Sequence, residues 1–277
     1  MAVHPDIPGI NISILVDNKP ATEHIPSPED FPPLIDATGH TRVEHNRCHI
    51  ESQAGKHFAI RFRISPVFKF PRGKTTLIIS IYVDGKPFDN RVILKRIILN
   101  KTRLNREYVD TISYCHREFP DGSSECYKPF FQDIRHPGYQ AEDGSGISDP
   151  QRIEALGSIQ VAIEVARETT SSAIMADDEF SDDKRNETLV VDNAALHRYG
   201  SGQIHATTYT RTAEPLDMQY VAVDREQHIG NFFFYYQSAP ADRAEFNLRD
   251  EFIDLNADKM VHLRSNPSKA RRMSGVP

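Results

Sequence analysis

The sequence is poor in cysteine and lacks a long apolar run. Its 277 residues include three cysteines, Cys48, Cys115 and Cys126. Three are too few for a disulfide framework in a chain of this size, so we expect reduced thiols. No stretch is long enough to span a bilayer, and residues 1–6 lack the basic start and apolar run of a secretory signal. These absences predict a cytoplasmic or nuclear protein that is not secreted by a signal peptide and has no membrane partner.

The sequence also has no excess of positive charge. Its formal net charge is −6 and its isoelectric point is near 6.1, whereas phosphate binding needs clustered Lys and Arg. We therefore expect no nucleic-acid partner for the surface as a whole, which leaves room for a local basic patch. The 39% apolar fraction and the mean hydropathy of −0.51 predict a real core beneath a polar surface.

The patterns of catalytic and cofactor sites are missing as well. Residues 71–76 resemble the end of a phosphate loop, but Phe68 stands where the first glycine belongs, and a predicted strand follows instead of a helix. Gly144–Gly146 and Gly200–Gly202 lack the G-x-S-x-G frame of a nucleophile elbow. We predict no cofactor, the catalytic residues are unknown, and the chain is more typical of a non-enzymatic protein.

A nine-residue phrase occurs twice in the chain. I-S-I-x-V-D-[NG]-K-P spans residues 12–20 and again 79–87. Its alternating apolar residues predict a strand, and Asp17-Asn18 and Asp84-Gly85 tolerate the positive φ of tight hairpin turns. A proline-rich segment follows the first copy and a returning strand follows the second. The phrase therefore predicts two strand ends with the same turn chemistry rather than an internal duplication.

The two-residue period marks further strands. It predicts strands at 48–50 and 58–64, separated by turn residues 52–56, and a half-buried strand at 156–167. Residues 231–236 are aromatic on both faces, which favours a strand that is covered on both sides over an exposed aromatic patch.

Two hairpins are predicted between these strands. In the first, 77–83 returns through 88–99, and a two-residue turn would place Ile81 opposite Phe88. The second spans 108–131, with a type I turn at Phe119-Pro120-Asp121-Gly122.

These elements predict a mainly β protein, an antiparallel β-sandwich that is jelly-roll-like or similar, with one or two short C-terminal helices. The predicted domain organisation is a single sandwich domain at 1–240 with mobile loops near 23–37, 135–150 and 168–188, a short helical extension at 241–264, and a disordered basic tail at 265–277. Within that tail, Ser274 follows two arginines in an R-R-x-S pattern and is a candidate phosphorylation site.

Histidine and cysteine supply good zinc ligands, but their spacing here does not predict a site. On an extended strand His45 and His49 share a face, and the chain has no C-x-x-C pair. Cys115 and Cys126 lie on opposing arms of one predicted hairpin, where a one-residue change of register decides whether they face each other. We expect structural cysteines and surface histidines, and these four residues are only weak metal candidates.

Several segments carry a resemblance to a known family. They are the strand after Pro8-Gly9 and residues 48–61, 81–86, 128–131, 156–161 and 232–238. In these segments the chain resembles a large fungal family of β-rich proteins catalogued only as a domain of unknown function. The resemblance implies a β-sandwich-like fold and supplies no activity and no catalytic residue. The chain departs from the family pattern after Ser238, at residues 245–248.

Three functions are compatible with these observations. The first is a non-enzymatic protein-interaction module that binds an unknown protein partner through a sheet edge or loops. The second is an enzyme or carbohydrate-binding protein with a pocket between the sheets or in the loops, which would need convergent polar groups such as His45, His49, Asp110 or His116. The third is nuclear association through the basic residues 269–272. The sequence leaves the ligand and the oligomeric state unknown.

Overall fold

The computed structural model describes part of the chain. The described residues are 2–3, 7–24, 47–119, 123–133, 155–169, 205–213 and 221–238. All of them belong to the first of two compact units, residues 1–238. The predicted helical extension, the basic tail with Ser274, and nearly all of the three predicted loops therefore lie outside the described residues.

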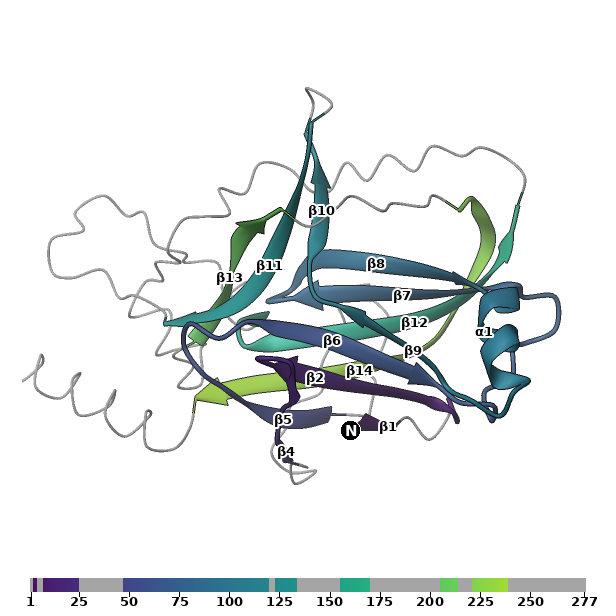
Figure 1. Ribbon diagram of the computed structural model, residues 1–277, viewed down its shortest axis with the longest axis horizontal. Coiled ribbons are helices and arrows are strands. Elements are labelled where there is room, and N and C mark those ends of the chain that lie inside the picture. The colour runs from purple at the N-terminus through teal and green to yellow at the C-terminus, as the bar shows by residue number, and fades with distance from the viewer. Residues whose placement is uncertain are drawn as a thin grey trace, which may run out of the picture. The chain divides into compact units, whose positions relative to one another are not determined.

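The described strands form three sheets (Figure 1). The five-stranded sheet contains β1 (Ala2–Val3), β2 (Ile10–Val16), β6 (Phe58–Ile64) and β9 (Tyr108–Ile112) in that order, with β3 (Lys19–Pro20) also paired to β2. The six-stranded sheet contains β4 (Glu23–His24), β5 (Arg47–Ser52), β14 (Val223–Ser238), β12 (Ser158–Glu168), β7 (Thr76–Val83) and β8 (Lys86–Leu94), again in that order. The three-stranded sheet has the order β10 (Cys115–Glu118), β11 (Ser124–Asp133), β13 (His205–Thr212).

One hydrophobic core joins the five-stranded and six-stranded sheets. Alternate residues of β2, β6, β7 and β12 contribute to it, and Ile12, Phe62, Ile79 and Ile163 are fully buried. Burying an aliphatic or aromatic side chain of this size contributes about 1.5–3 kcal/mol relative to leaving it in water. The shared core confirms the predicted mainly β, sandwich-like fold. In the described residues no helix is long and apolar enough to cross a membrane.

Both copies of the repeated phrase end as the sequence predicts. β2 and β7 stop at two-residue turns whose φ angles are 48° and 63° at Asp17 and Asn18, and 50° and 74° at Asp84 and Gly85. Two consecutive positive φ values are the signature of the turn that best matches the twist of a hairpin. The turns lead into β3 and β8.

The predicted strand at 88–99 is wrong in two respects. Residues Lys95–Thr102 form helix α1, because β7 begins at Thr76, opposite Leu94, and offers no partner beyond it. A helix satisfies these backbone groups internally. In addition, Ile81 pairs with Asp89 and Tyr82 with Pro87, so that Phe88 is the extra residue of a bulge and is fully buried.

The hairpin predicted over 108–131 is shorter than expected. β9 leaves it and pairs with β6, where Ile112 is buried in the main core, so the hairpin consists of β10 and β11 alone. Residues 120–122 of its predicted turn lie outside the described residues. β9 also packs Tyr108 against this core, and the local pattern did not contain that information.

Two further expectations concern burial and strand direction. β12 is buried on both faces, as Gln160 and Ala162 show, because it lies between β14 and β7 and not at an edge. It is therefore not the half-buried strand that its polar residues suggested.

β14 pairs with β5 in parallel, whereas the other described pairs are antiparallel. The aromatic segment of β14 is covered on both sides as predicted, since Phe232 to Phe234 and Tyr236 are all buried.

Candidate functional site

The cysteines named as metal candidates do not face one another. In the β10–β11 hairpin, His116 lies opposite Cys126, and Cys115 lies opposite Tyr127. Cys115 and Cys126 therefore point to opposite faces of the hairpin, and both are buried. The third cysteine, Cys48, is also buried, and burial raises the pKa of its thiol to about 12. All three cysteines are therefore buried thiols.

Of the two histidines named as metal candidates, only His49 lies in the described part of the chain. His45 lies outside the described residues. His49 lies on β5, with its ring 5.8 Å from the ring of Tyr235. Within the described parts of the chain, no group of three or more His, Cys, Asp or Glu side chains is placed to hold a metal ion.

A serine, a histidine and an aspartate meet where the six-stranded and three-stranded sheets come together. Ser52 Oγ lies 2.7 Å from His205 Nδ1, and His205 Nε2 lies 3.1 Å from Asp133 Oδ1. The residue types are those of a nucleophilic triad, but the exposure is reversed. Ser52 is fully buried, whereas the Asp133 side chain is 71% exposed. A nucleophile must reach its substrate, so this cluster links β5 to β13 and β11 rather than forming a catalytic site.

A second polar cluster surrounds the carboxylate of Asp84. The amides of Gly157 and Thr207 each donate to one carboxylate oxygen at 2.8 Å, and the Tyr236 hydroxyl lies 2.6 and 2.8 Å from the two oxygens. Burial raises the pKa of Asp84 to about 6, although these donors favour the charged form. Burial and the neighbouring Asp84 also raise the pKa of Tyr236. The cluster ties the β7–β8 turn to β12, β13 and β14.

Two of the polar residues suggested for a pocket approach Arg91. Arg91 Nε lies 3.9 Å from Asp110 Oδ2. Burial lowers the pKa of His116, and the positive charges of Arg91 and Arg117 add to that effect. Asp89 belongs to the same neighbourhood, and burial raises its pKa to about 6 against the attraction of Arg91. Asp110 and His116 thus lie near one cation on β8, whereas His49 lies on β5, which three strands separate from β8 in the six-stranded sheet.

A groove of about 330 Å³ lies beside the first copy of the repeated turn. Its lining includes Asp17, Glu51, Gln53 and Lys56. Lys56 Nζ donates to Asp17 Oδ2 at 2.6 Å, and both side chains are nearly half exposed. The hydrogen bond from Lys56 lowers the pKa of Asp17. The Asp17 and Lys56 side chains of this groove are therefore already paired with each other and hydrated.

The most unusual surface lies where helix α1, the loop before β7 and strand β9 meet. We call it the end surface and define it by four exposed aliphatic side chains: Val67, Ile97, Leu104 and Val109. Their exposed fractions are 61%, 42%, 67% and 48%, and they make up four of the five large apolar side chains that are exposed among the described residues. Single exposed apolar residues are common, whereas several on neighbouring elements are less so.

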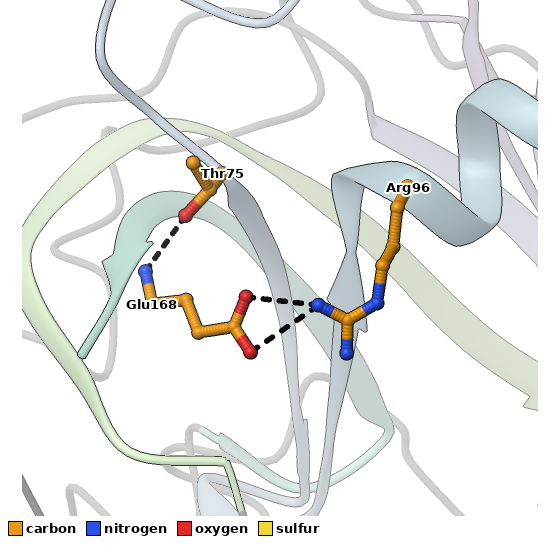
Figure 2. A network of polar contacts seen from close by, with 3 residues as sticks. All are labelled: Thr75, Arg96 and Glu168. Atoms are coloured by element: carbon orange, nitrogen blue, oxygen red, sulfur yellow. Dashed lines mark hydrogen bonds and ion pairs between the residues drawn. The ribbon is translucent and has the colours of Figure 1, made fainter. Parts of the chain in front are cut away.

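The elements that carry the end surface are held together by specific contacts. The Lys95 amide donates to the Thr75 carbonyl at 2.7 Å, and Lys95 Nζ lies 5.3 Å from the centre of the Phe70 ring. Figure 2 shows the next link, in which Arg96 donates to Glu168 at 3.2 Å and the Glu168 amide donates to Thr75 Oγ1 at 2.7 Å. The loop, the start of α1 and the end of β12 are thereby fixed to one another.

Comparison with known proteins identifies the family. A family model described as "Domain of unknown function (DUF7918)" matches residues 9–245. The chain belongs to this family. No curated protein and no solved structure matches the chain. The resemblance noted in the sequence is thereby confirmed, and the expected fungal distribution stays a prediction.

The matched range places the sites within the DUF7918 domain. It begins just before β2 and extends past the end of β14, so it includes the three polar clusters, the groove and the end surface. The family description assigns no activity, and the function must be argued from the sites themselves.

Sequence reasoning missed the polar clusters and the end surface for different reasons. Ser52, Asp133 and His205 are far apart in the chain, and no spacing rule joins them. The end surface had a local signal, because residues 66–75 and 95–106 contain basic and aliphatic residues and no Asp or Glu. Counting charge by segment, rather than over the whole chain, would have found it.

Proposed function

We propose that this DUF7918 domain is a non-enzymatic protein-interaction module that binds its partner through the end surface. The observation that carries the proposal is the exposure of four aliphatic side chains on elements that lie at one end of the described strands, namely α1 with the turn after it, the loop before β7, and β9 (Figure 1). Complete burial of one such side chain contributes about 1.5–3 kcal/mol. Four together supply a gross contribution that can offset the cost of association.

The strand at this surface adds a second feature. β9 is the last strand in the described order of the five-stranded sheet, paired with β6 on one side. An edge strand offers backbone donors and acceptors to an extended peptide, while neighbouring apolar side chains provide specificity. The end surface therefore combines two elements that protein partners use.

Site-specific photo-crosslinking tests the proposal. A photoreactive residue replaces Leu104 in the full-length protein, and a matched control carries it at Gln53, an exposed residue in the turn at the other end of β6. We expect one protein from native extract to react at Leu104 and not at Gln53. The purified pair should then form a complex of fixed stoichiometry that Ile97→Asp and Leu104→Asp weaken. Equal labelling at both positions, or a complex that tolerates both substitutions, would contradict the proposal.

The groove beside Asp17 favours the alternative, an enzyme or carbohydrate-binding protein. Its volume of about 330 Å³ is at the small end of the range for ligand sites. A glycan array with the full-length protein and with Lys56→Ala tests this alternative. A glycan that binds the wild-type protein and not the variant would support it, and binding that ignores Lys56 would count against it.

A further inference from the structure

We propose that the partner segment bound at the end surface is an acidic polypeptide that also carries aliphatic side chains. This inference rests on the proposed function, and it adds the chemistry of the partner. It is motivated by the positive charges around the four aliphatic side chains, because a purely apolar partner would not account for them.

Two of the three segments that carry the end surface are exclusively basic in their charged residues, whereas the acidic residues beside Val109 on the third, Glu107 and Asp110, lie 3.2 and 3.9 Å from Arg63 and Arg91. Residues 66–75 and 95–106 contain no Asp and no Glu, although the whole chain has a formal net charge of −6. Their basic residues are Lys69, Arg72, Lys74, Lys95, Arg96, Lys101, Arg103 and Arg106. A local concentration of one sign in a protein of the opposite net charge attracts a partner of the opposite sign.

Several of these cations have no counter-ion within the described parts of the chain. Arg96 is paired with Glu168, and Lys69 Nζ donates to the Pro66 carbonyl. By contrast, the side chains of Arg72, Lys101, Arg103 and Arg106 are exposed, and none of the four forms an ion pair or side-chain hydrogen bond with a described residue. Their charges are available to a partner without first breaking an internal contact.

The basic and aliphatic side chains alternate along α1 and the turn that continues it. Ile97 and Lys101 are four residues apart in the helix and share a face. The Leu104 amide donates to the Lys101 carbonyl at 3.1 Å, so Leu104 follows one turn later. Arg103 is the C-cap residue of α1, and Arg106 lies two residues after Leu104. A partner covering this line meets aliphatic and cationic groups in turn.

This mixture favours a polypeptide over a nucleic acid or a lipid surface. A phosphate backbone would pair with the cations and leave the aliphatic side chains with no apolar partner. Single-stranded nucleic acids use exposed aromatic rings for stacking, and lipid interfaces favour aromatic side chains as anchors. The aromatic rings of this region are engaged internally, since Phe68 and Phe70 lie 5.1 Å apart and Lys95 lies over Phe70. An acidic segment with Leu, Ile or Val matches both groups.

Fluorescence anisotropy with defined peptides tests the inference on the full-length protein. The probe is a fluorescein-labelled peptide of Asp, Glu and Leu. Two matched peptides replace either every Leu with Ser or every acidic residue with its amide. A labelled oligothymidine and vesicles of phosphatidylcholine with phosphatidylserine represent the other partner classes. We expect the acidic Leu peptide to bind most tightly, both matched peptides to bind more weakly, and its affinity to fall as NaCl is raised.

Charge-reversal variants locate the binding. Arg103→Glu together with Arg106→Glu should weaken binding of the acidic Leu peptide about tenfold or more, and Leu104→Ser should weaken it severalfold. Lys19→Glu, an exposed reversal at the far end of β2, should leave binding unchanged. Circular dichroism of each variant confirms that the fold is retained, which we expect because all of these side chains are exposed.

The outcomes separate this inference from the proposed function. A partner that crosslinks at Leu104 but ignores both NaCl and the Arg103/Arg106 reversal would overturn the acidic chemistry and leave the interaction module standing. Absence of binding by the acidic Leu peptide, or tighter binding of the oligothymidine or the vesicles, would also overturn it. Failure to crosslink any protein at Leu104 would instead count against the proposed function.

Discussion

The two copies of the repeated phrase form the same turn in opposite surroundings. In each copy the aspartate has a positive φ, and its amide donates at 2.9 Å to a carbonyl of a neighbouring segment, His57 for Asp17 and Ser158 for Asp84. The side chains then differ. Asp17 meets an exposed lysine, whereas Asp84 accepts hydrogen bonds from Tyr236 and from two backbone amides.

The difference shows that local sequence sets the turn and tertiary context sets the role of its side chain. Lys56 comes from the β5–β6 turn beside β2, and water can replace it. The donors to Asp84 come from β12, β13 and β14, which must all be in place for the carboxylate to be satisfied. The second copy therefore connects two sheets, and the first copy does not.

Removal of the buried carboxylate should have the largest effect. Asp84→Ala leaves the Gly157 and Thr207 amides without their acceptor, and each unpaired buried donor costs about 1–3 kcal/mol. The Tyr236 hydroxyl loses its bonds to the carboxylate and keeps only Thr207 Oγ1, at 3.0 Å. We expect a loss of about 3 kcal/mol or more in the free energy of unfolding, measured by urea denaturation. A loss no larger than that of Asp17→Ala would mean that the two copies are equivalent after all.

The strands and turns of this fold could be predicted because their signals are local. The period of two located β2, β6, β7 and β12, and the Asp-Asn and Asp-Gly pairs located the turns. Helix α1 could not be predicted in the same way, because its apolar residues are the consecutive run 97–99, which has neither the period of a strand nor that of a helix. It forms because β7 begins at Thr76 and leaves residues after Leu94 without a partner strand.

The candidate sites depended even more on long-range contacts. Asp84 was recognised only as a turn residue, since its donors Gly157, Thr207 and Tyr236 are remote in sequence. His116 and Asp110 were named together, and both lie near Arg91, but no local pattern predicted that cation as their neighbour. The exposure of Ile97 followed from helix α1, which the sequence assigned to a strand in part, and Leu104 lies in the turn after that helix.

Exchange of the second turn residue between the copies should give unequal losses of folding stability. Asn18 and Gly85 both have positive φ, but a Cβ at position 85 would lie 2.7 Å from the Ala155 Cβ. We expect Gly85→Asn to cost about 2 kcal/mol through this overlap, and Asn18→Gly to cost less than about 1 kcal/mol. Thermal unfolding of both variants checks the difference.

A second substitution identifies the cause of that loss. Ala155→Gly removes the methyl group that the new Cβ would meet, so it should restore part of the stability of Gly85→Asn. If Ala155→Gly gives no recovery, the overlap is not the reason for the unequal losses, and the turn conformation itself must differ between the copies.

Asp84 and Asp17 should also give opposite dependence of stability on pH. Burial raises the pKa of Asp84 from 3.8 to about 6, so its contribution to stability is fully present below about pH 4 and is lost as the pH rises through 6. We expect a loss of roughly 1–2 kcal/mol over this window, which Asp84→Asn should remove. Burial also raises the pKa of Asp89. Denaturation curves of Asp89→Asn at each pH therefore give the part of the pH dependence that comes from Asp89 and not from Asp84. A stability that rises from pH 4 to 6 in the wild type and not in Asp84→Asn would contradict this sign.

Removal of the exposed carboxylate should have the smallest effect. The Asp17 and Lys56 side chains are 47% and 45% exposed, so water replaces either partner and salt screens their attraction. The hydrogen bond from Lys56 lowers the pKa of Asp17, which means that any contribution is present above the ordinary pKa and is lost as the pH falls through the lowered value. We expect the urea midpoints of Asp17→Ala and Lys56→Ala to match that of the wild type at neutral pH, in low and high NaCl. A loss of stability in Asp17→Ala as large as that of Asp84→Ala would contradict this expectation. It would show that the first copy also holds the fold together, because only a carboxylate with partners that water cannot replace produces such a loss.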